Sequence, residues 1–224
     1  MAKKHKQNEV TEIDETIQAS KSFFEKNKKV ILYGSGAILA IIIACLLIHQ
    51  FYIVPRNQKA QEALFKAEQI FQAGTYEKAL NGDGENGGFL AVIDKFGSTK
   101  AGNLARLYAG ICYYKDGKYQ EATEMLQSFD DCGDEMVSPA VIGMLGNIYA
   151  ELGDNEKAVS TLLKAAKEAD NNTLSTVYLL QAGQIYESLQ QNDKALDCYN
   201  QIKDKYQQSQ AYTEVDKYIE RLSK

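Results

Sequence analysis

Residues 146–162 read GNIYAELGDNEKAVSTL, and this stretch decides the fold because its pattern recurs along the chain. Similar copies lie at 110–126 (GICYYKDGKYQEATEML) and 183–199 (GQIYESLQQNDKALDCY), and a less regular one lies at 67–80 (AEQIFQAGTYEKAL). Each copy has a small residue, an aromatic or aliphatic residue, a short turn, and an alanine that opens a second helical run. The pattern predicts pairs of helices that bury their apolar faces by stacking.

The spacing of the copies indicates the type of repeat. Ala79, Ala122, Ala158 and Ala195 are separated by 43, 36 and 37 residues. The tetratricopeptide repeat (TPR) has a period of about 34 residues and this kind of pattern. Residues 58–205 therefore resemble that repeat, with insertions of 9, 2 and 3 residues. The resemblance implies an all-α, TPR-like solenoid of about four helix pairs.

Small residues are expected where paired helices cross, because a side chain there would force the helices apart, and tyrosines are expected between neighbours. The positions assigned to repeat packing are Ala67, Ala79, Gly110, Tyr113, Ala122, Gly146, Tyr149, Ala158, Gly183, Tyr186 and Ala195. Residues 207–224 (QQSQAYTEVDKYIERLSK) predict a capping helix. Its inner stripe would hold Tyr212, Val215, Tyr218, Ile219 and Leu222.

The insertion at 81–88, NGDGENGG, predicts a surface loop before a helix at 89–96. Its alternating Asn81, Asp83 and Glu85 are similar to a calcium loop. The sixth and twelfth positions, however, are Asn86 and Val92 where that loop has Gly and Glu. Calcium is therefore not expected here.

An apolar run precedes the repeats. Residues 30–54 (VILYGSGAILAIIIACLLIHQFYIV) contain no Asp, Glu, Lys or Arg. As a helix the run would be about 37 Å long, against roughly 30 Å for the hydrocarbon core of a bilayer. It predicts a transmembrane helix between a basic cytoplasmic tail (1–29) and a TPR-like helical repeat domain (55–224).

The distribution of lysine predicts the orientation of that helix. Residues 1–29 carry seven lysines, whereas residues 55–224 have a net charge of −7. The positive side of a span normally stays in the cytoplasm, so the repeats would lie on the other side. An amphipathic face of Val10, Ile13, Ile17 and Phe24 in the tail could meet the inner leaflet or a partner, or be disordered.

Two features lie within the apolar run itself. Gly36, Ala40 and Ala44 share one helix face, where another membrane helix could approach closely, although small residues are common in such helices. Ile42 to Cys45 is similar to a bacterial lipobox. The apolar run continues beyond Cys45, which favours a retained anchor over lipidation.

The catalytic inventory of the chain is sparse. Of 224 residues, 45% are apolar and 25% charged, and the net charge of −5 predicts that the chain has no nucleic-acid partner. The two histidines, His5 and His49, have no second metal ligand nearby, and no Cys-x-x-Cys, phosphate loop or nucleophile elbow occurs. No enzyme activity, cofactor or metal is expected.

The acids of FDDCGDE (129–135) suggest a solvated loop, where Cys132 could be exposed, whereas Cys112 and Cys198 suit a core.

The first helices of solenoid pairs line a concave groove. Starts at residues 60, 103, 139 and 176 place on it Leu104, Leu107, Ile111, Tyr114, Asn147, Glu151, Gln184 and Glu187. The alternative is that these residues pack against the next repeat or the capping helix. TPR proteins that clamp chaperone C-termini use Lys, Asn and Arg at such positions. Leu104 and Leu107 replace them here, so that activity is not implied.

The order of tail, anchor and repeats resembles the bacterial ancillary Sec-translocon subunit family. FFEKNKKVI (23–31) and GFLAVIDKFGSTKAGNLARLYAGICYY (88–114) are similar to its Bacteroidetes-type members. The resemblance implies a non-catalytic scaffold in the bacterial inner membrane. Its periplasmic domain would bind the Sec translocon, periplasmic chaperones or exported chains. An alternative is a structural TPR subunit of an outer-membrane assembly complex, which would require lipidation at Cys45 or another route of sorting.

Overall fold

The structure is a computed structural model that describes residues 25–30, 32–131 and 133–223. Within those residues the chain is helical and has no β-strand, only an isolated bridge between Gly82 and Gly87. This confirms the predicted all-α class. The amphipathic face expected in the tail and the loop residue Cys132 lie outside the described residues. The chain divides into two compact units, residues 1–56 and 57–224.

The first unit contains the apolar run of residues 30–54. Residues 32–48 are α-helical and a π-helical turn follows at His49–Ile53. Pro55 explains the turn, because its ring would clash with the carbonyl of residue 51 and it has no N–H to donate. An added Cβ on Gly36 would meet nothing within 4 Å, so this side of the predicted Gly36, Ala40 and Ala44 face is uncovered by the described chain.

One helix among the described residues, Glu25–Gln72, has the length and apolar composition needed to cross a bilayer. None of its most apolar window is buried against other described residues. The helix lies near the N-terminus, where the apolar run of a signal sequence is also found.

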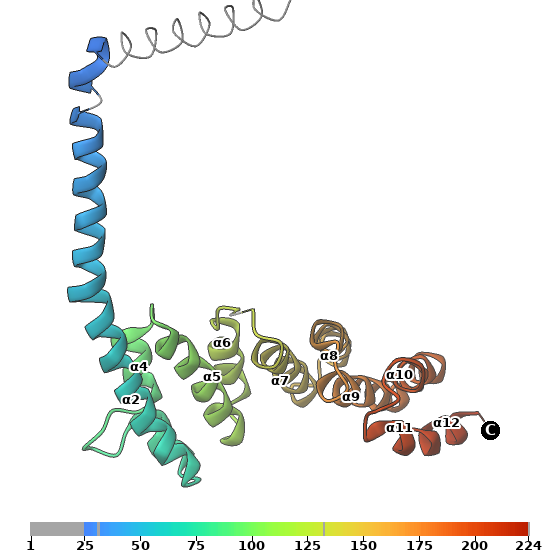
Figure 1. Ribbon diagram of the computed structural model, residues 1–224. Coiled ribbons are helices and arrows are strands. Elements are labelled where there is room, and N and C mark those ends of the chain that lie inside the picture. Colours follow the sequence, from blue (N-terminus) through green and yellow to red (C-terminus); the bar gives the residue numbers. More distant parts are fainter. Residues whose placement is uncertain (1–24, 31, 132, 224) are drawn as a thin grey trace, which may run out of the picture. The chain divides into compact units, whose positions relative to one another are not determined.

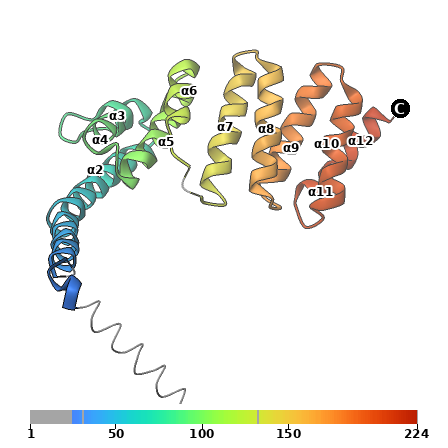
Figure 2. The same ribbon diagram turned by 90° about the horizontal axis from the view of Figure 1, so that it is seen from above.

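The second unit is a row of antiparallel helix pairs. Figures 1 and 2 show the later helices, α7 to α10, lying side by side in chain order. The helices are α2 (Val54–Gln72), α3 (Tyr76–Asn81), α4 (Phe89–Phe96), α5 (Lys100–Lys115), α6 (Tyr119–Gln127), α7 (Val137–Glu151), α8 (Asn155–Ala169), α9 (Leu174–Ser188), α10 (Asn192–Lys205), α11 (Ala211–Glu214) and α12 (Asp216–Leu222). Helix α4 lies at the position predicted from the sequence, after the 81–88 loop.

The turn inside each pair has the same backbone geometry. Two residues before the second helix, Gly74, Gly117 and Gly153 have φ of 76°, 73° and 79°. Gln190 takes this position in the fourth pair, with φ of 58°. Left-handed backbone costs a residue with a Cβ about 1–2 kcal/mol, whereas glycine adopts it freely. The fourth pair therefore keeps the turn at a cost that the other three avoid.

We expect Gln190→Gly to raise the free energy of unfolding by about 0.5–1 kcal/mol. The relief of left-handed strain should exceed the extra freedom that glycine gains in the unfolded chain. Denaturant titration monitored by circular dichroism measures the change. Gln191→Gly is the matched control, because Gln191 has φ of −94° and should lose stability. Equal effects of the two substitutions would contradict this account.

The interior of the row is built from small residues at the crossings. The alanines assigned to packing, Ala67, Ala79, Ala122, Ala158 and Ala195, are all 0% exposed. A Cβ added to Gly110 or Gly146 would lie 2.6–2.7 Å from the side chain of Leu126 or Leu162, which lies on the second helix of the same pair. The close approach of paired helices thus depends on the absence of a side chain at Gly110 of α5, Gly146 of α7 and Gly183 of α9.

The predicted packing tyrosines differ in burial. Tyr149 is buried, and Gln127 donates a hydrogen bond of 2.9 Å to its hydroxyl. Tyr113 and Tyr186 are half-buried. All three contribute their backbone carbonyls to the turns, since these accept the N–H of the residue five positions later, Lys118, Asp154 and Gln191. The tyrosine of each Gly-x-x-Tyr copy therefore stands at a fixed distance before the turn, where its carbonyl closes the turn.

The two cysteines assigned to the core are buried there. Cys112 is 1% exposed and Cys198 is 2% exposed. Burial raises the pKa of the Cys112 thiol to about 12 and that of Cys198 to about 11. Both thiols therefore stay protonated at neutral pH, and neither is an activated nucleophile.

The C-terminal segment covers the end of the row, but as two short helices instead of the single capping helix predicted. The chain is α-helical at Ala211–Glu214 and at Asp216–Leu222, with Val215 between them. Val215 is 0% exposed and belongs to the same apolar cluster as Tyr199 and Ile202 of α10. Of the predicted inner stripe, Tyr218, Ile219 and Leu222 pack against this cluster, and Tyr212 is half-buried beneath the Lys203 ammonium.

Candidate functional site

A groove of about 470 Å³ crosses the first helices of three successive pairs. Its volume lies within the range of ligand-binding clefts, and it is open to solvent. The lining residues are Tyr114 of α5, Asn147, Ala150 and Glu151 of α7, and Gln181, Gln184, Ile185 and Ser188 of α9. The structure thus brings together four of the residues predicted to line a groove, namely Tyr114, Asn147, Glu151 and Gln184.

One corner of the groove combines two aromatic rings with a carboxylate. The rings of Tyr114 and Tyr119 are 5.7 Å apart and tilted by 51°. The Tyr119 hydroxyl donates a hydrogen bond of 3.4 Å to Oε2 of Glu151. Desolvation, followed by the neighbouring Glu151 carboxylate, raises the pKa of Tyr119, so the phenol remains a donor. We call Tyr114, Tyr119 and Glu151 the aromatic-acidic corner.

The wall formed by α9 contains a polar atom without a partner. Oε1 of Gln181 is buried and accepts no hydrogen bond from the described part of the chain. A buried acceptor left unpaired costs about 1–3 kcal/mol. Because the Gln181 side chain also lines the groove, a rotation of its amide would turn this oxygen toward a ligand N–H.

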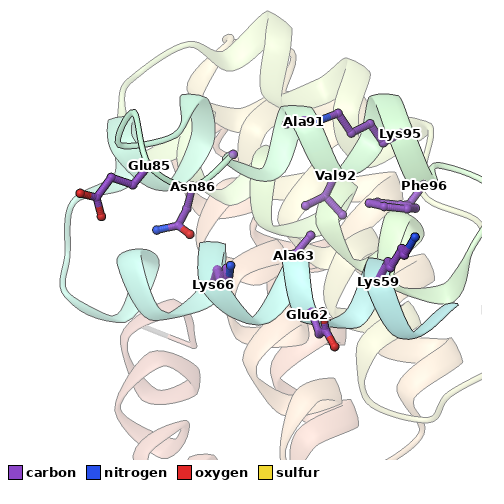
Figure 3. Close-up of a pocket in the computed structure, with 11 residues that line it drawn as sticks. Lys59, Glu62, Ala63, Lys66, Glu85, Asn86, Ala91, Val92, Lys95 and Phe96 are labelled. Atoms are coloured by element: carbon purple, nitrogen blue, oxygen red, sulfur yellow. The ribbon is translucent and has the colours of Figure 1, made fainter. Parts of the chain in front are cut away.

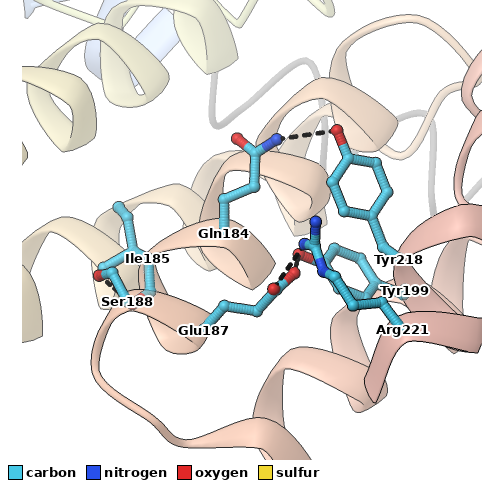
Figure 4. Close-up of polar contacts among 7 residues, drawn as sticks. All are labelled: Gln184, Ile185, Glu187, Ser188, Tyr199, Tyr218 and Arg221. Carbon is cyan, nitrogen blue, oxygen red and sulfur yellow. Dashed lines mark hydrogen bonds and ion pairs between the residues drawn. The ribbon is translucent and has the colours of Figure 1, made fainter. Parts of the chain in front are cut away.

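Two polar residues of α9, Gln184 and Glu187, contact helix α12. The Gln184 amide donates a hydrogen bond of 3.2 Å to the Tyr218 hydroxyl. Glu187 accepts a 2.5 Å hydrogen bond from Tyr199 and forms a 2.6 Å ion pair with Arg221, as Figure 4 shows. Burial, followed by the Glu187 carboxylate, raises the pKa of Tyr199. Glu187 thus serves the cap, which is the alternative considered for it from the sequence.

The structure separates the remaining predicted groove residues from this site. Leu104 packs on the cluster of α2 to α5 and lines a different pocket of about 490 Å³, beside the 129–134 loop. Leu107 packs on the cluster shared by α6 and α7, and Ile111 is half-buried on α5. Leu104 and Leu107 therefore contribute to packing between repeats, which is the alternative that the sequence left open for them.

A further pocket, of about 280 Å³, lies between α2, α4 and the 81–88 loop (Figure 3). Its charged residues are Lys59, Glu62, Lys66, Glu85 and Lys95. Both signs are present, so the lining singles out no ligand class by charge.

The loop acids act as local caps. Oδ1 of Asp134 accepts the backbone N–H groups of Met136 and Val137 at 2.8 and 2.7 Å, and Asp131 accepts the Ser138 hydroxyl. In the 81–88 loop, Oδ1 of Asp83 accepts two backbone N–H groups. The described residues contain no group of three or more His, Cys, Asp or Glu placed to hold a metal ion.

Sequence reasoning missed Gln181, Ile185, Ala150 and Ser188 in the groove, and Tyr119 beside it. Helical spacing could have revealed most of them, because residues three or four positions apart share one face of a helix. Gln181, Gln184 and Ser188 follow that spacing. Tyr119 carried no such signal, since it begins a second helix and reaches Glu151 of the next pair through space.

Stacked helix pairs with glycine-dependent crossings and a groove across their first helices define a helical repeat solenoid. The model of the tetratricopeptide repeat-like domain family matches residues 21–222. The chain belongs to this family.

Solved structures support the same fold. A tetratricopeptide repeat protein from Parabacteroides merdae matches with a TM-score of 0.57 and 18% identity, covering 74% of this chain and 60% of its own length. The TPR-like repeats of a putative kinesin light chain from Podosopora anserina match with a TM-score of 0.56 and 15% identity, covering 74% and 86%. MamA matches with a TM-score of 0.50 and 18% identity, covering 70% and 92%. No curated protein matches the sequence.

Proposed function

We propose that this chain is a non-catalytic scaffold that binds partner proteins through the groove of α5, α7 and α9. Residues 30–54 anchor it in the bacterial inner membrane with the tail 1–29 in the cytoplasm and the TPR-like domain 55–224 in the periplasm. There it associates with the Sec translocon and periplasmic chaperones during protein export.

The groove is the observation that carries the binding role. It is open, crosses three pairs, and offers aromatic, amide and carboxylate groups. Groups of this kind recognise extended polypeptide through backbone amides and side-chain anchors. The TPR-like fold supports the same role, because solenoids present extended binding surfaces.

The anchoring and sidedness are supported by different observations. The uncharged run at 30–54 lies in a helix long and apolar enough to span a bilayer. The lysines before it and the acidic domain after it favour a cytoplasmic tail. The export role is supported by the sequence resemblance to the ancillary Sec-translocon subunits.

Photocrosslinking in living cells tests this proposal. We expect a photoreactive phenylalanine analogue in place of Tyr114 to form covalent adducts with translocon subunits, periplasmic chaperones or exported chains, because Tyr114 lines the groove. The same analogue at Ser160, an exposed position on α8, is the matched control and should not capture them. Mass spectrometry identifies the adducts.

Two results would contradict the proposal. Capture of the same proteins from both positions would remove the groove as the binding surface. Capture of cytosolic proteins by the Tyr114 position would overturn the sidedness.

A further inference from the structure

From the aromatic-acidic corner and the unpaired Gln181 oxygen, we infer that the groove selects extended polypeptide segments that carry a lysine or arginine side chain. This inference rests on the proposed function, since it names the chemistry of the segment that the groove binds. The cationic side chain lies against Tyr114 and Tyr119 beside Glu151, and an N–H group of the segment pairs with Gln181.

Charge complementarity is the first support. Glu151 is the one charged residue among those lining the groove, and it is exposed. The other carboxylate on this side, Glu187, is already neutralised by Arg221. An acidic segment would therefore meet an unpaired like charge at Glu151, whereas a basic one would meet its counterion.

The geometry of the corner is the second support. Two tyrosine rings with centroids 5.7 Å apart stand beside a carboxylate that the Tyr119 hydroxyl orients at 3.4 Å. Cations bind over aromatic faces, and the combination with an adjacent carboxylate favours Lys or Arg over a neutral side chain. A neutral apolar residue could pack on the rings but would leave the Glu151 charge without a cation beside it.

The Gln181 oxygen is the third support, and it is independent of charge. It is a buried acceptor within the groove lining and has no donor among the described residues. Every non-proline residue of an extended segment carries one backbone N–H, which is the donor this oxygen lacks. Asn147 lines the same groove and offers an amide that both donates and accepts.

Equilibrium titration with defined peptides tests the inference on the full chain in mild detergent. The probes are fluorescein-labelled Gly-Ser-Ala-X-Ala-Ser-Gly peptides in which X is Arg, Lys, Leu or Glu, and binding is followed by fluorescence anisotropy. We expect the Arg and Lys peptides to bind about tenfold more tightly than the Leu peptide, with the Glu peptide weakest. The preference should shrink at high salt because Glu151 is exposed.

Two substitutions connect that preference to the named groups. Glu151→Gln should abolish the advantage of Arg and Lys over Leu. Glu156→Gln, the same change at an exposed position on α8, should leave it intact. Gln181→Met should weaken all four peptides alike, about fivefold, while the thermal midpoint stays the same or rises, because an unpaired buried acceptor is removed. A purely structural Gln181 would instead lower the midpoint.

The outcomes separate this inference from the proposed function. Peptides that bind without preference for a cation, or a preference that survives Glu151→Gln, overturn the inference while leaving a protein-binding groove. If no peptide binds and Tyr114 captures no partner in cells, the proposed function fails together with the inference.

Discussion

Gly183→Leu is expected to lower the free energy of unfolding of the repeat domain by about 3 kcal/mol. Even a single Cβ at residue 183 would lie 2.7 Å from Cζ of Tyr199 and closer still to Cε1. Tyr199 cannot withdraw easily, because its ring is 0% exposed and its hydroxyl is bonded to Glu187 at 2.5 Å. Overpacking of a closed core forces side chains off their rotamers and moves the backbone.

Chemical denaturation of the full chain in detergent, followed by circular dichroism, measures this loss. Ser188→Leu is the matched control, because Ser188 is exposed on the same helix and should change stability by less than about 0.5 kcal/mol. A double variant with Tyr199→Ala should be destabilised by at least about 1 kcal/mol less than the sum of the single changes, since truncation makes room for the leucine. Strict additivity would show that the two residues do not compete for space.

The clash also explains why the pairing of helices was readable from the sequence. A small residue is needed where two helices cross closely, so Gly110, Gly146 and Gly183 recur with the repeat, and Ala67 takes their place in the first pair. The same holds for Ala122 and Ala158 on the facing helices, which have no exposed surface. Local spacing therefore carried the information for the pairs.

The groove was only partly readable, because its lining depends on how successive pairs are rotated against one another. Tyr114 and Asn147 are 33 residues apart in the chain but line one cleft. Leu104 lies nearer the start of α5 and lines the separate pocket of about 490 Å³ instead. The sequence of α5 alone does not give the position of the neighbouring pairs, and that position decides which pocket Leu104 and Tyr114 line.

The contacts at the C-terminal end of the row were the least readable part. Glu187 has the residue type and position of a groove carboxylate, yet its carboxylate forms an ion pair with Arg221 and accepts a hydrogen bond from Tyr199. The contact between Glu187 and Arg221 joins residues 34 positions apart, and it depends on where the C-terminal segment turns back over the row. The burial of Val215 fixes the position of that segment. The repeat pattern ends before this segment, so it does not predict which residue of the C-terminal segment meets Glu187.

Val215→Asp is accordingly expected to destabilise the C-terminal pairs by about 3–5 kcal/mol. Val215 is 0% exposed within the apolar cluster of Tyr199 and Ile202, so the substitution would bury a carboxylate among apolar side chains. In a solenoid each pair is held mainly by its neighbours, so the loss should be local. Hydrogen exchange should therefore rise in α9 and α10 while α5 stays protected.

Thr213→Asp is the matched control for this change, because residue 213 is exposed two positions away and receives the same charge. It should leave both exchange and the unfolding midpoint close to those of the parent chain. If the two aspartates behave alike, residues 211–222 do not seal the row, and Glu187 should then be as available to a ligand as Glu151. If exchange rises equally in α5 and α10, the pairs unfold as one cooperative body, and the nearest-neighbour account of this domain is wrong.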